Sequence, residues 1–261
     1  MKNCRLRAVG RECAELQVES AVLSLIGGRE ENQDRVAIAK ADSAVLLIAV
    51  DGMGGHSDGA RAAAVAVEVI TESFKRVVAP VFDPVGFLHL TIGRAHARIV
   101  QIGAEVRLEA RPRATCALCL VQDGTAFFAH VGDSRIYHLR ERIVQERTRD
   151  HSHVELLLQE GLITEAEIAD HPMRNYVECC LGGSYALPGM SVSSARRLAR
   201  NDMLMVCTDG FWSGLEDRDV ATFGAGGEPV EQSLQRLADQ AVRTNGPYSD
   251  NTSAAGLRWL G

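Results

Sequence analysis

Aspartates stand at the ends of several apolar stretches of this chain. Asp51 directly follows the run VLLIAV, Asp133 comes two residues after AFFAHV, and Asp209 comes two residues after MLMVC. Asp34 and Asp250 each come just before another apolar segment. In an antiparallel sheet, the end of one strand lies beside the start of its neighbour, so carboxylates from both kinds of position can meet. We therefore expect these side chains to share one edge of a sheet.

An edge of this kind would need a cation. Clustered carboxylates repel one another, and burial adds the loss of their hydration. Aspartates, backbone carbonyls and water form the oxygen ligand set that suits Mg²⁺ or Mn²⁺, whereas Zn²⁺ favours His and Cys. The absence of a side chain at Gly52 would let its carbonyl oxygen turn toward such an ion. The pattern predicts a divalent metal site.

Each aspartate also has a purely structural interpretation. Asp-Gly is a common hairpin turn, and Asp123-Gly124 between two predicted strands fits that description. Asp51 fits it less well, because more glycines and then a helical segment follow. Asp209 could cap a helix, and Asp250 could form an Asx-turn. The same pattern at five strand ends favours the metal interpretation.

Hydrophobic periodicity predicts strands in hairpins and helices in separate blocks, which is typical of an α+β layered sandwich. A capping box at Thr164 to Glu167 predicts one further short helix, and Asp58 is expected in the first turn of another. No repeat or low-complexity linker interrupts the chain, so we expect a single domain over residues 1–261. Strands are expected at 18–26, 35–39, 45–50, 114–121, 125–131, 135–139, 142–145, 190–198, 203–207 and 252–260, and helices at 59–78, 85–108, 154–160 and 230–243.

Composition narrows the class of protein. With 261 residues and 46% hydrophobic content, the chain can bury a large core. Its net charge of −6 argues against nucleic acid or an anionic membrane as a partner. No apolar run reaches the roughly 18 residues of a membrane span, and the first 20 residues are too polar for a signal peptide. We expect a soluble, cytoplasmic protein.

The cysteines suggest no chemistry of their own. Cys116 and Cys119 form a CxxC within a predicted strand, where an odd separation places the side chains on opposite faces. No second pair completes a zinc site. Cys179, Cys180 and Cys207 also lie in apolar surroundings. We expect buried, reduced thiols.

Seven motifs in a fixed order resemble those of the metal-dependent protein phosphatases (PPM, or type 2C, serine/threonine phosphatases), above all the compact bacterial members. A single Asp-Gly pair would be a weak signal, whereas the ordered set spans almost the whole chain. The motifs are GREENQD (28–34), VDGMGGH (50–56), HVGDSRIY (130–137), RTRDHS (147–152), HPMRN (171–175), CTDGFW (207–212) and SDNTS (249–253).

The resemblance implies a four-layer α-β-β-α sandwich of two mainly antiparallel sheets, with a small flap subdomain at about residues 150–183. It also implies two core Mn²⁺ or Mg²⁺ ions at one edge and a possible third, weaker ion. In this family the flap lies beside the catalytic cleft and influences the choice of substrate.

The resemblance assigns roles to the aspartates. Asp51 would bridge both core ions, and the carbonyl of Gly52 would bind one of them. Asp209 and Asp250 would complete the ligands of the other ion. Asp34 would contact the metals directly or through water.

Further positions follow from the same motifs. Asp133 would help to hold the third ion. Arg29 would grip the substrate phosphate, with a surface ion pair to Glu30 or Glu31 as the alternative. His56 could donate a proton to the leaving group, or it could only contact substrate or support the loop.

The expected activity is hydrolysis of phosphoserine and phosphothreonine by a hydroxide that bridges the two metals. The partners would be phosphorylated proteins, with a bacterial serine/threonine kinase that the enzyme opposes, and the chain would act as a monomer. One alternative is a catalytically weak, phosphoprotein-binding regulatory module of the same fold. Another, a phosphatase with an aspartate nucleophile, would need the pattern DxD, and Asp209-Gly210-Phe211 lacks it.

Overall fold

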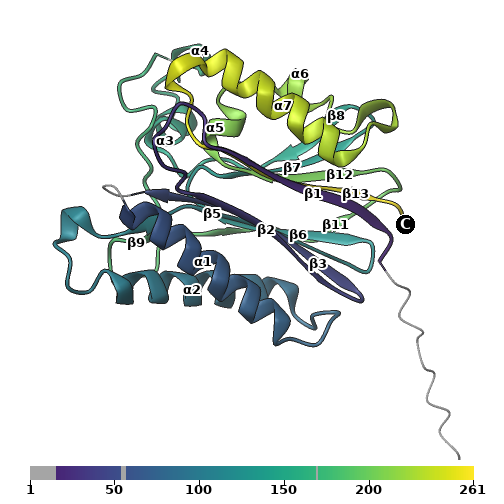
Figure 1. Cartoon of the computed structure of the whole chain (residues 1–261), viewed down its shortest axis with the longest axis horizontal. Helices are drawn as coiled ribbons and strands as arrows, with labels where there is room; N and C mark the ends of the chain where they lie inside the picture. The colour runs from purple at the N-terminus through teal and green to yellow at the C-terminus, as the bar shows by residue number, and fades with distance from the viewer. Residues whose placement is uncertain (1–15, 54–56, 169) are drawn as a thin grey trace, which may run out of the picture.

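Two β-sheets lie face to face, and helices cover the outer face of each (Figure 1). This architecture comes from a computed structural model that describes residues 16–53, 57–168 and 170–261. The four layers follow the order helix, sheet, sheet, helix, and every strand pair is antiparallel. The predicted α-β-β-α sandwich is confirmed.

The first sheet has five strands and is covered on its outer face by α7 (Val230–Asn245) (Figure 1). Short helices α5 (Asp209–Trp212) and α6 (Asp217–Val220) lie on the same side. In spatial order the strands are β1 (Val18–Leu25), β13 (Thr252–Trp259), β12 (Met203–Cys207), β7 (Arg135–Arg140) and β8 (Ile143–Arg147).

The second sheet has eight strands and carries α1 (Ser57–Lys75) and α2 (Pro84–Ile102) on its outer face. Asp58 lies in the first turn of α1, as expected. Six of its strands follow the spatial order β10 (Ser191–Val192), β6 (Thr125–Val131), β5 (Cys116–Gln122), β3 (Ala44–Met53), β4 (Arg113–Ala114) and β9 (Leu181–Gly182). The other two strands lie off this path: β2 (Asp34–Ala41) pairs with β3, and β11 (Arg196–Arg197) pairs with β6. Short 3₁₀ turns occupy Leu108–Ala110, Ala225–Gly227 and Gly246–Tyr248.

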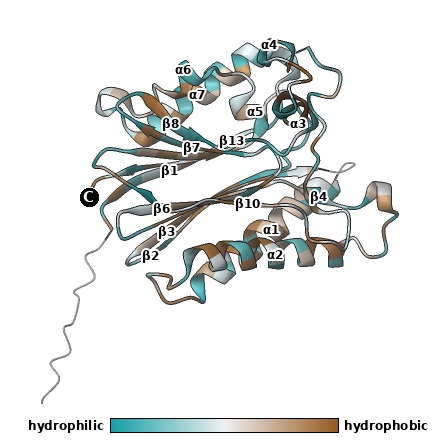
Figure 2. Ribbon diagram, turned by 180° about the vertical axis from the view of Figure 1, so that it is seen from behind, coloured by the Kyte–Doolittle hydropathy of each residue, from teal (hydrophilic) through white to brown (hydrophobic). Residues whose placement is uncertain are grey.

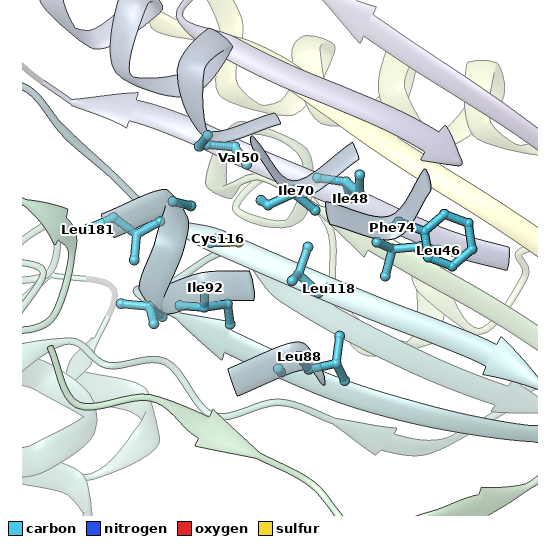
Figure 3. Packing of buried hydrophobic residues seen from close by; sticks show 14 of the residues in the cluster. Leu46, Ile48, Val50, Ile70, Phe74, Leu88, Ile92, Cys116, Leu118 and Leu181 are labelled. Carbon is cyan, nitrogen blue, oxygen red and sulfur yellow. The ribbon is translucent and has the colours of Figure 1, made fainter. Parts of the chain in front are cut away.

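Strand β3 is buried on both faces because each face meets a different layer. Leu46, Ile48 and Val50 pack against α1 and α2, where Ile70 and Ile92 meet them (Figure 3). The alternate residues Val45, Leu47 and Ala49 pack between the two sheets. This explains why the strand is a continuous apolar run and not an alternating one.

The same alternation separates the two cysteines of the CxxC. Cys116 packs with the helical layer and Cys119 packs between the sheets, as their odd spacing predicts. Burial raises the pKa of the Cys116 thiol to about 12. Cys179 and Cys180 are only partly buried, and all five cysteines of the described residues are free thiols.

Local signals at turns and helix starts also agree with the structure. Asp123 and Gly124 both have left-handed φ values, 48° and 62°, which is the type I′ hairpin geometry. In the capping box, the backbone N–H and the hydroxyl of Thr164 each donate to Glu167 at 2.8 Å. These residues begin α4 (Glu165–Ile168).

Two predicted elements end differently in the structure. Helix α2 stops at Ile102 and not at Leu108, because the chain turns at Gly103, and Pro112 packs against the bare Cα there. A Cβ at Gly103 would lie 2.7 Å from Pro112 Cδ. The strand predicted over 190–198 is split into β10 and β11, since the Ser193 hydroxyl accepts the N–H of Phe128 in place of a regular ladder.

Residues 150–183, the predicted flap, leave the first sheet and return to the second. This segment contains α3 (His153–Gln159) and α4, and it folds back on itself where Ser152 pairs with Val177. It rejoins the sandwich through β9, which pairs with β4. In Figure 2 both hydrophobic and hydrophilic residues occur along this part of the chain.

No helix within 16–53, 57–168 and 170–261 combines the length and the apolar character that a bilayer span requires.

The core between the sheets gives the first prediction. Leu47 is fully buried there, so Leu47→Ala should lower the free energy of unfolding by about 2–5 kcal/mol through lost burial and a residual cavity. Leu90→Ala on α2 is the control, because Leu90 is 58% exposed and its loss should cost less than about 1 kcal/mol. Urea unfolding followed by circular dichroism measures both. Equal effects of the two changes would contradict the assigned burial.

Candidate metal centre

Asp34 and Asp51 face each other across the pair β2–β3. Asp34 is 2% exposed, and Asp51 is partly exposed at the end of its strand. Like charges directly opposite each other destabilise a sheet. The Asp51 backbone is nevertheless fixed, because its N–H donates to the Thr115 hydroxyl at 3.1 Å and its carbonyl accepts the Thr115 N–H at 2.8 Å.

Asp209 and Asp250 come together at the matching end of the first sheet. Asp209 begins α5 directly after β12, and Asp250 precedes β13, which pairs with β12. Gly210 lets these segments touch: a Cβ there would lie 2.2 Å from the Asn251 carbonyl oxygen and 3.0 Å from Asp250 Cβ. Any larger residue at 210 would push the two carboxylates apart.

Asp133 lies in the connection from β6 to β7, where the chain crosses from the second sheet to the first. Its carbonyl accepts the indole N–H of Trp212 at 2.9 Å, and the next residue, Ser134, shares a 2.6 Å hydroxyl hydrogen bond with Thr115. Its carboxylate atom Oδ1 is buried and has no hydrogen-bond partner among the described residues. A buried carboxylate oxygen without a partner is costly unless a cation binds it.

The carboxylates share one electrostatic environment. Burial raises the pKa of Asp34 to about 7, and the charges of Asp209 and Asp250 add to this, although hydrogen bonds from Thr208 and Ser253 oppose it. Burial and the neighbouring Asp250 raise the pKa of Asp209 to about 6. The structure thus brings the five predicted aspartates of both sheets to one place.

Burial and neighbouring carboxylates also raise the pKa values of Asp51 and Asp133. Burial, followed by the charge of Asp209, holds the pKa of each well above its usual range. Asp34 also raises the pKa of Asp51, and Asp150 raises that of Asp133.

Gly52 occupies a space that admits no side chain. A Cβ there would lie 2.0 Å from the Gly59 carbonyl oxygen, so the start of α1 packs directly on the β3 backbone. The Gly52 N–H donates to the Gln33 carbonyl at 3.3 Å. His56, predicted as a proton donor or substrate contact, lies outside the described residues.

Arg29 pairs with Asp250, through Nη2 and Oδ2 at 2.5 Å. The structure therefore does not show the alternative pairing with Glu30 or Glu31. The Arg29 side chain is 57% exposed, so this ion pair is held only weakly and the guanidinium can exchange partners.

No group of three or more His, Cys, Asp or Glu side chains in the described part of the chain has the geometry of a metal site as it stands. Protein donors engage several of the carboxylate oxygens. The Thr208 hydroxyl donates to Asp34 at 2.7 Å, and Asp250 accepts from Arg29 and from the Asn251 N–H. The donor chemistry, the mutual repulsion and the unpartnered Asp133 oxygen still fit divalent cations that bind oxygen.

Sequence reasoning missed Asp150 and its partner Arg135. They form a two-pronged ion pair with both distances at 2.8 Å, and the Arg135 guanidinium lies 3.4 Å from the centre of the Trp212 ring. The charge of Asp150 also raises the pKa of Asp209. Asp150 stands in the motif RTRDHS, but its spacing alone gave it no role.

Asn251 is a second missed residue. Its side-chain oxygen accepts the Gln33 N–H at 2.8 Å, and its Nδ2 donates to the carbonyls of Ile26 and Glu31 at 2.8 and 3.0 Å. One side chain thus secures the loop that carries Arg29.

Comparison with known proteins supports this picture. The model of the family described as "Protein phosphatase 2C" matches residues 24–249. The chain belongs to this family. It is 31% identical, over 82% of its length and 86% of the relative's, to a putative protein phosphatase 2C-type from Streptococcus pyogenes. Membership confirms the predicted enzyme class, a serine/threonine protein phosphatase of the bacterial PPM type.

Solved structures show the same fold. The serine/threonine phosphatase of S. agalactiae is 26% identical, with a TM-score of 0.85 over 94% of this chain and 100% of that one. The catalytic domain of the phosphatase PstP in complex with two manganese ions is 24% identical, with a TM-score of 0.77 over 94% of this chain and 99% of that one.

The raised pKa values predict how stability depends on pH. An aspartate with a raised folded pKa supports folding below its unfolded pKa, and this contribution is lost as the pH rises through the folded pKa. For Asp34 the window runs from 3.8 to about 7. We expect metal-free protein to lose stability across this window, and Asp34→Asn to lessen the loss by on the order of 2 kcal/mol.

Thermal melts in chelator, at several values of pH within that window, measure this effect. The control is Asp42→Asn, at an exposed hairpin aspartate, which should leave the pH dependence unchanged. Parallel pH curves for wild type and Asp34→Asn would contradict the buried, repelling environment.

Proposed function

We propose that this enzyme hydrolyses phosphoserine and phosphothreonine in proteins with Mn²⁺ or Mg²⁺ ions held by the aspartates at the sandwich edge. One observation carries the proposal: carboxylates from both sheets meet there and raise one another's pKa. The two manganese ions of the related PstP catalytic domain support two core ions in this chain. A third, weaker ion near Asp133 is consistent with its unpartnered oxygen.

The proposed ligand roles follow the positions of the residues. Asp51 lies opposite Asp34, and the charges of Asp209 and Asp250 in the first sheet also reach it, which would suit a ligand shared by two ions. The Gly52 carbonyl would bind one ion, while Asp209 and Asp250 would bind the other. Asp34 would act directly or through water.

Bound ions would supply a water of lowered pKa as nucleophile and would offset the charge of the phosphate. The chain itself supplies positioning. If Asp250 held a cation, its charge would be offset, and Arg29 would be available to form charge-assisted hydrogen bonds with phosphate oxygens. The Asn251 side chain keeps the Arg29 loop in place during this exchange.

His56 remains our candidate for protonating the departing serine or threonine oxygen, or for contacting substrate. We further propose a single domain, in which residues 150–183 act as a flap beside the cleft and affect the choice of substrate. No proposed metal aspartate is missing from this chain, so nothing favours the binding-only regulatory module.

The wider setting is also a proposal. We infer a cytoplasmic, monomeric enzyme in signal transduction that acts on phosphorylated proteins and opposes a serine/threonine kinase. The net charge of −6 supports partners other than nucleic acid.

Phosphate release from a phosphothreonine peptide tests the function. Wild type should be active with Mn²⁺ and inactive with chelator, and Asp51→Asn should lower kcat by at least about 100-fold, because it removes the proposed shared ligand. Circular dichroism should show an unchanged fold, since the amide relieves repulsion. The control is Asp42→Asn. If the wild-type protein released no phosphate with any divalent ion tried, the proposed phosphatase activity would be refuted.

Arg29→Ala tests the phosphate contact. KM for the phosphopeptide should rise about tenfold or more, because an arginine–phosphate contact is lost, while the affinity for Mn²⁺ measured by calorimetry should not fall. Arg76→Ala, at an exposed arginine just after α1, should change neither value. A large loss of Mn²⁺ affinity in Arg29→Ala would show that this residue supports the metals instead.

A further inference from the structure

Strand β4 places an arginine on the catalytic face of the second sheet. Asp51 and Met53 share one face of β3, and Met53 pairs with Arg113, so Arg113 belongs to that face as well. Ala114, one residue on, faces the opposite way into the helical core. Met53 lies about 7 Å along β3 from Asp51, and Arg113 lies opposite Met53 on the neighbouring strand about 4.8 Å away, so the backbone positions of Arg113 and Asp51 are roughly 8 Å apart.

Arg111 and Tyr185 belong, together with Arg113, to one group of side chains near β4 and β9. The Arg111 guanidinium lies 5.1 Å from the centre of the Tyr185 ring, and its Nη1 donates to the Gly183 carbonyl at 3.3 Å. Arg113 donates to the Leu108 carbonyl at 3.4 Å. Both guanidinium groups therefore touch backbone oxygens, which satisfy some donors but leave the positive charge without a counterion.

Several other arginines of the sandwich form ion pairs with carboxylates. Arg135 pairs with Asp150, and Arg140 pairs with the buried Asp202. No salt bridge among the described residues involves Arg111 or Arg113. In a chain of net charge −6, uncompensated positive charge beside the proposed metal centre would attract a negatively charged ligand.

The cluster is built on fixed elements. β4 pairs with β3 on one side and with β9 on the other. The Gly182 N–H donates to His96 of α2 at 3.2 Å, which ties β9 to that helix. In Figure 1, β9 lies beside α2, as these contacts require. A subsite held in this way can bind a substrate without the entropy cost of ordering its own residues first.

We propose that Arg111 and Arg113 form a subsite for acidic side chains that flank the phosphorylated residue, so that the enzyme prefers acidic phosphopeptides. The proposal rests on the proposed function, because it takes the phosphoryl group to lie at the aspartate centre. The separation of roughly 8 Å corresponds to two to three residues of an extended peptide. Carboxylates two or so positions from the phosphoresidue would therefore reach the arginines.

The test compares three phosphothreonine peptides whose flanking residues, on both sides, are aspartates, alanines or lysines. For wild type with Mn²⁺, kcat/KM should be about tenfold higher for the acidic than for the alanine peptide, as expected for partly buried charge-assisted hydrogen bonds. Arg113→Ala and Arg111→Ala should each reduce this ratio, and Arg113→Glu should favour the lysine peptide. Arg98→Ala, on the exposed face of α2, is the matched control and should keep the ratio.

Hydrolysis of p-nitrophenyl phosphate, which is too small to reach the subsite, should stay within about twofold of wild type in all these variants. The acidic preference should also weaken as NaCl is raised, because salt screens the ion pairs. No acidic preference in wild type, or a preference that survives Arg113→Glu, would overturn the subsite. Failure of wild type to hydrolyse p-nitrophenyl phosphate would instead refute the proposed function, and fluorescence anisotropy of the labelled peptides would then still test acidic binding.

Discussion

Repulsion between carboxylates is the constraint around which this fold is organised. The sandwich ends its strands so that aspartates from both sheets meet, although burial and like charge raise the pKa of Asp34 and Asp209 far above the ordinary value. The network around Thr115, Ser134 and Asn251 fixes the backbone beneath these side chains. The protein thus gives up stability at one edge and concentrates negative charge there, which supports the proposed binding of divalent cations.

Close backbone approach makes this arrangement possible. Glycines at 52 and 210 sit where a Cβ would lie 2.0 and 2.2 Å from a neighbouring carbonyl oxygen, so neighbouring segments contact each other directly. This brings the start of α1 against β3 and the start of α5 against the segment before β13. The arginine side chains near this edge form two kinds of ion pair. Arg135 forms a largely buried pair with Asp150, whereas Arg29 forms an exposed pair with Asp250.

Much of the architecture could be predicted from the sequence because each signal is local. The apolar run of β3, the turn at Asp123-Gly124 and the box from Thr164 to Glu167 fix their own geometry. Prediction failed where a distant contact decided the outcome. Pro112 packs against Gly103 and ends α2, and the Ser193 hydroxyl interrupts the strand over 190–198 by bonding to Phe128.

The sequence by itself determined which residues carry charge, where strands end and, through its ordered motifs, the family. Only the tertiary structure decided that Arg29 pairs with Asp250, that Asp150 adds its charge to the site and that Arg113 shares a face with Asp51. The reason is physical: residue types and apolar runs are local properties of the chain, whereas the partner of a charge depends on segments that pack together only in the folded protein.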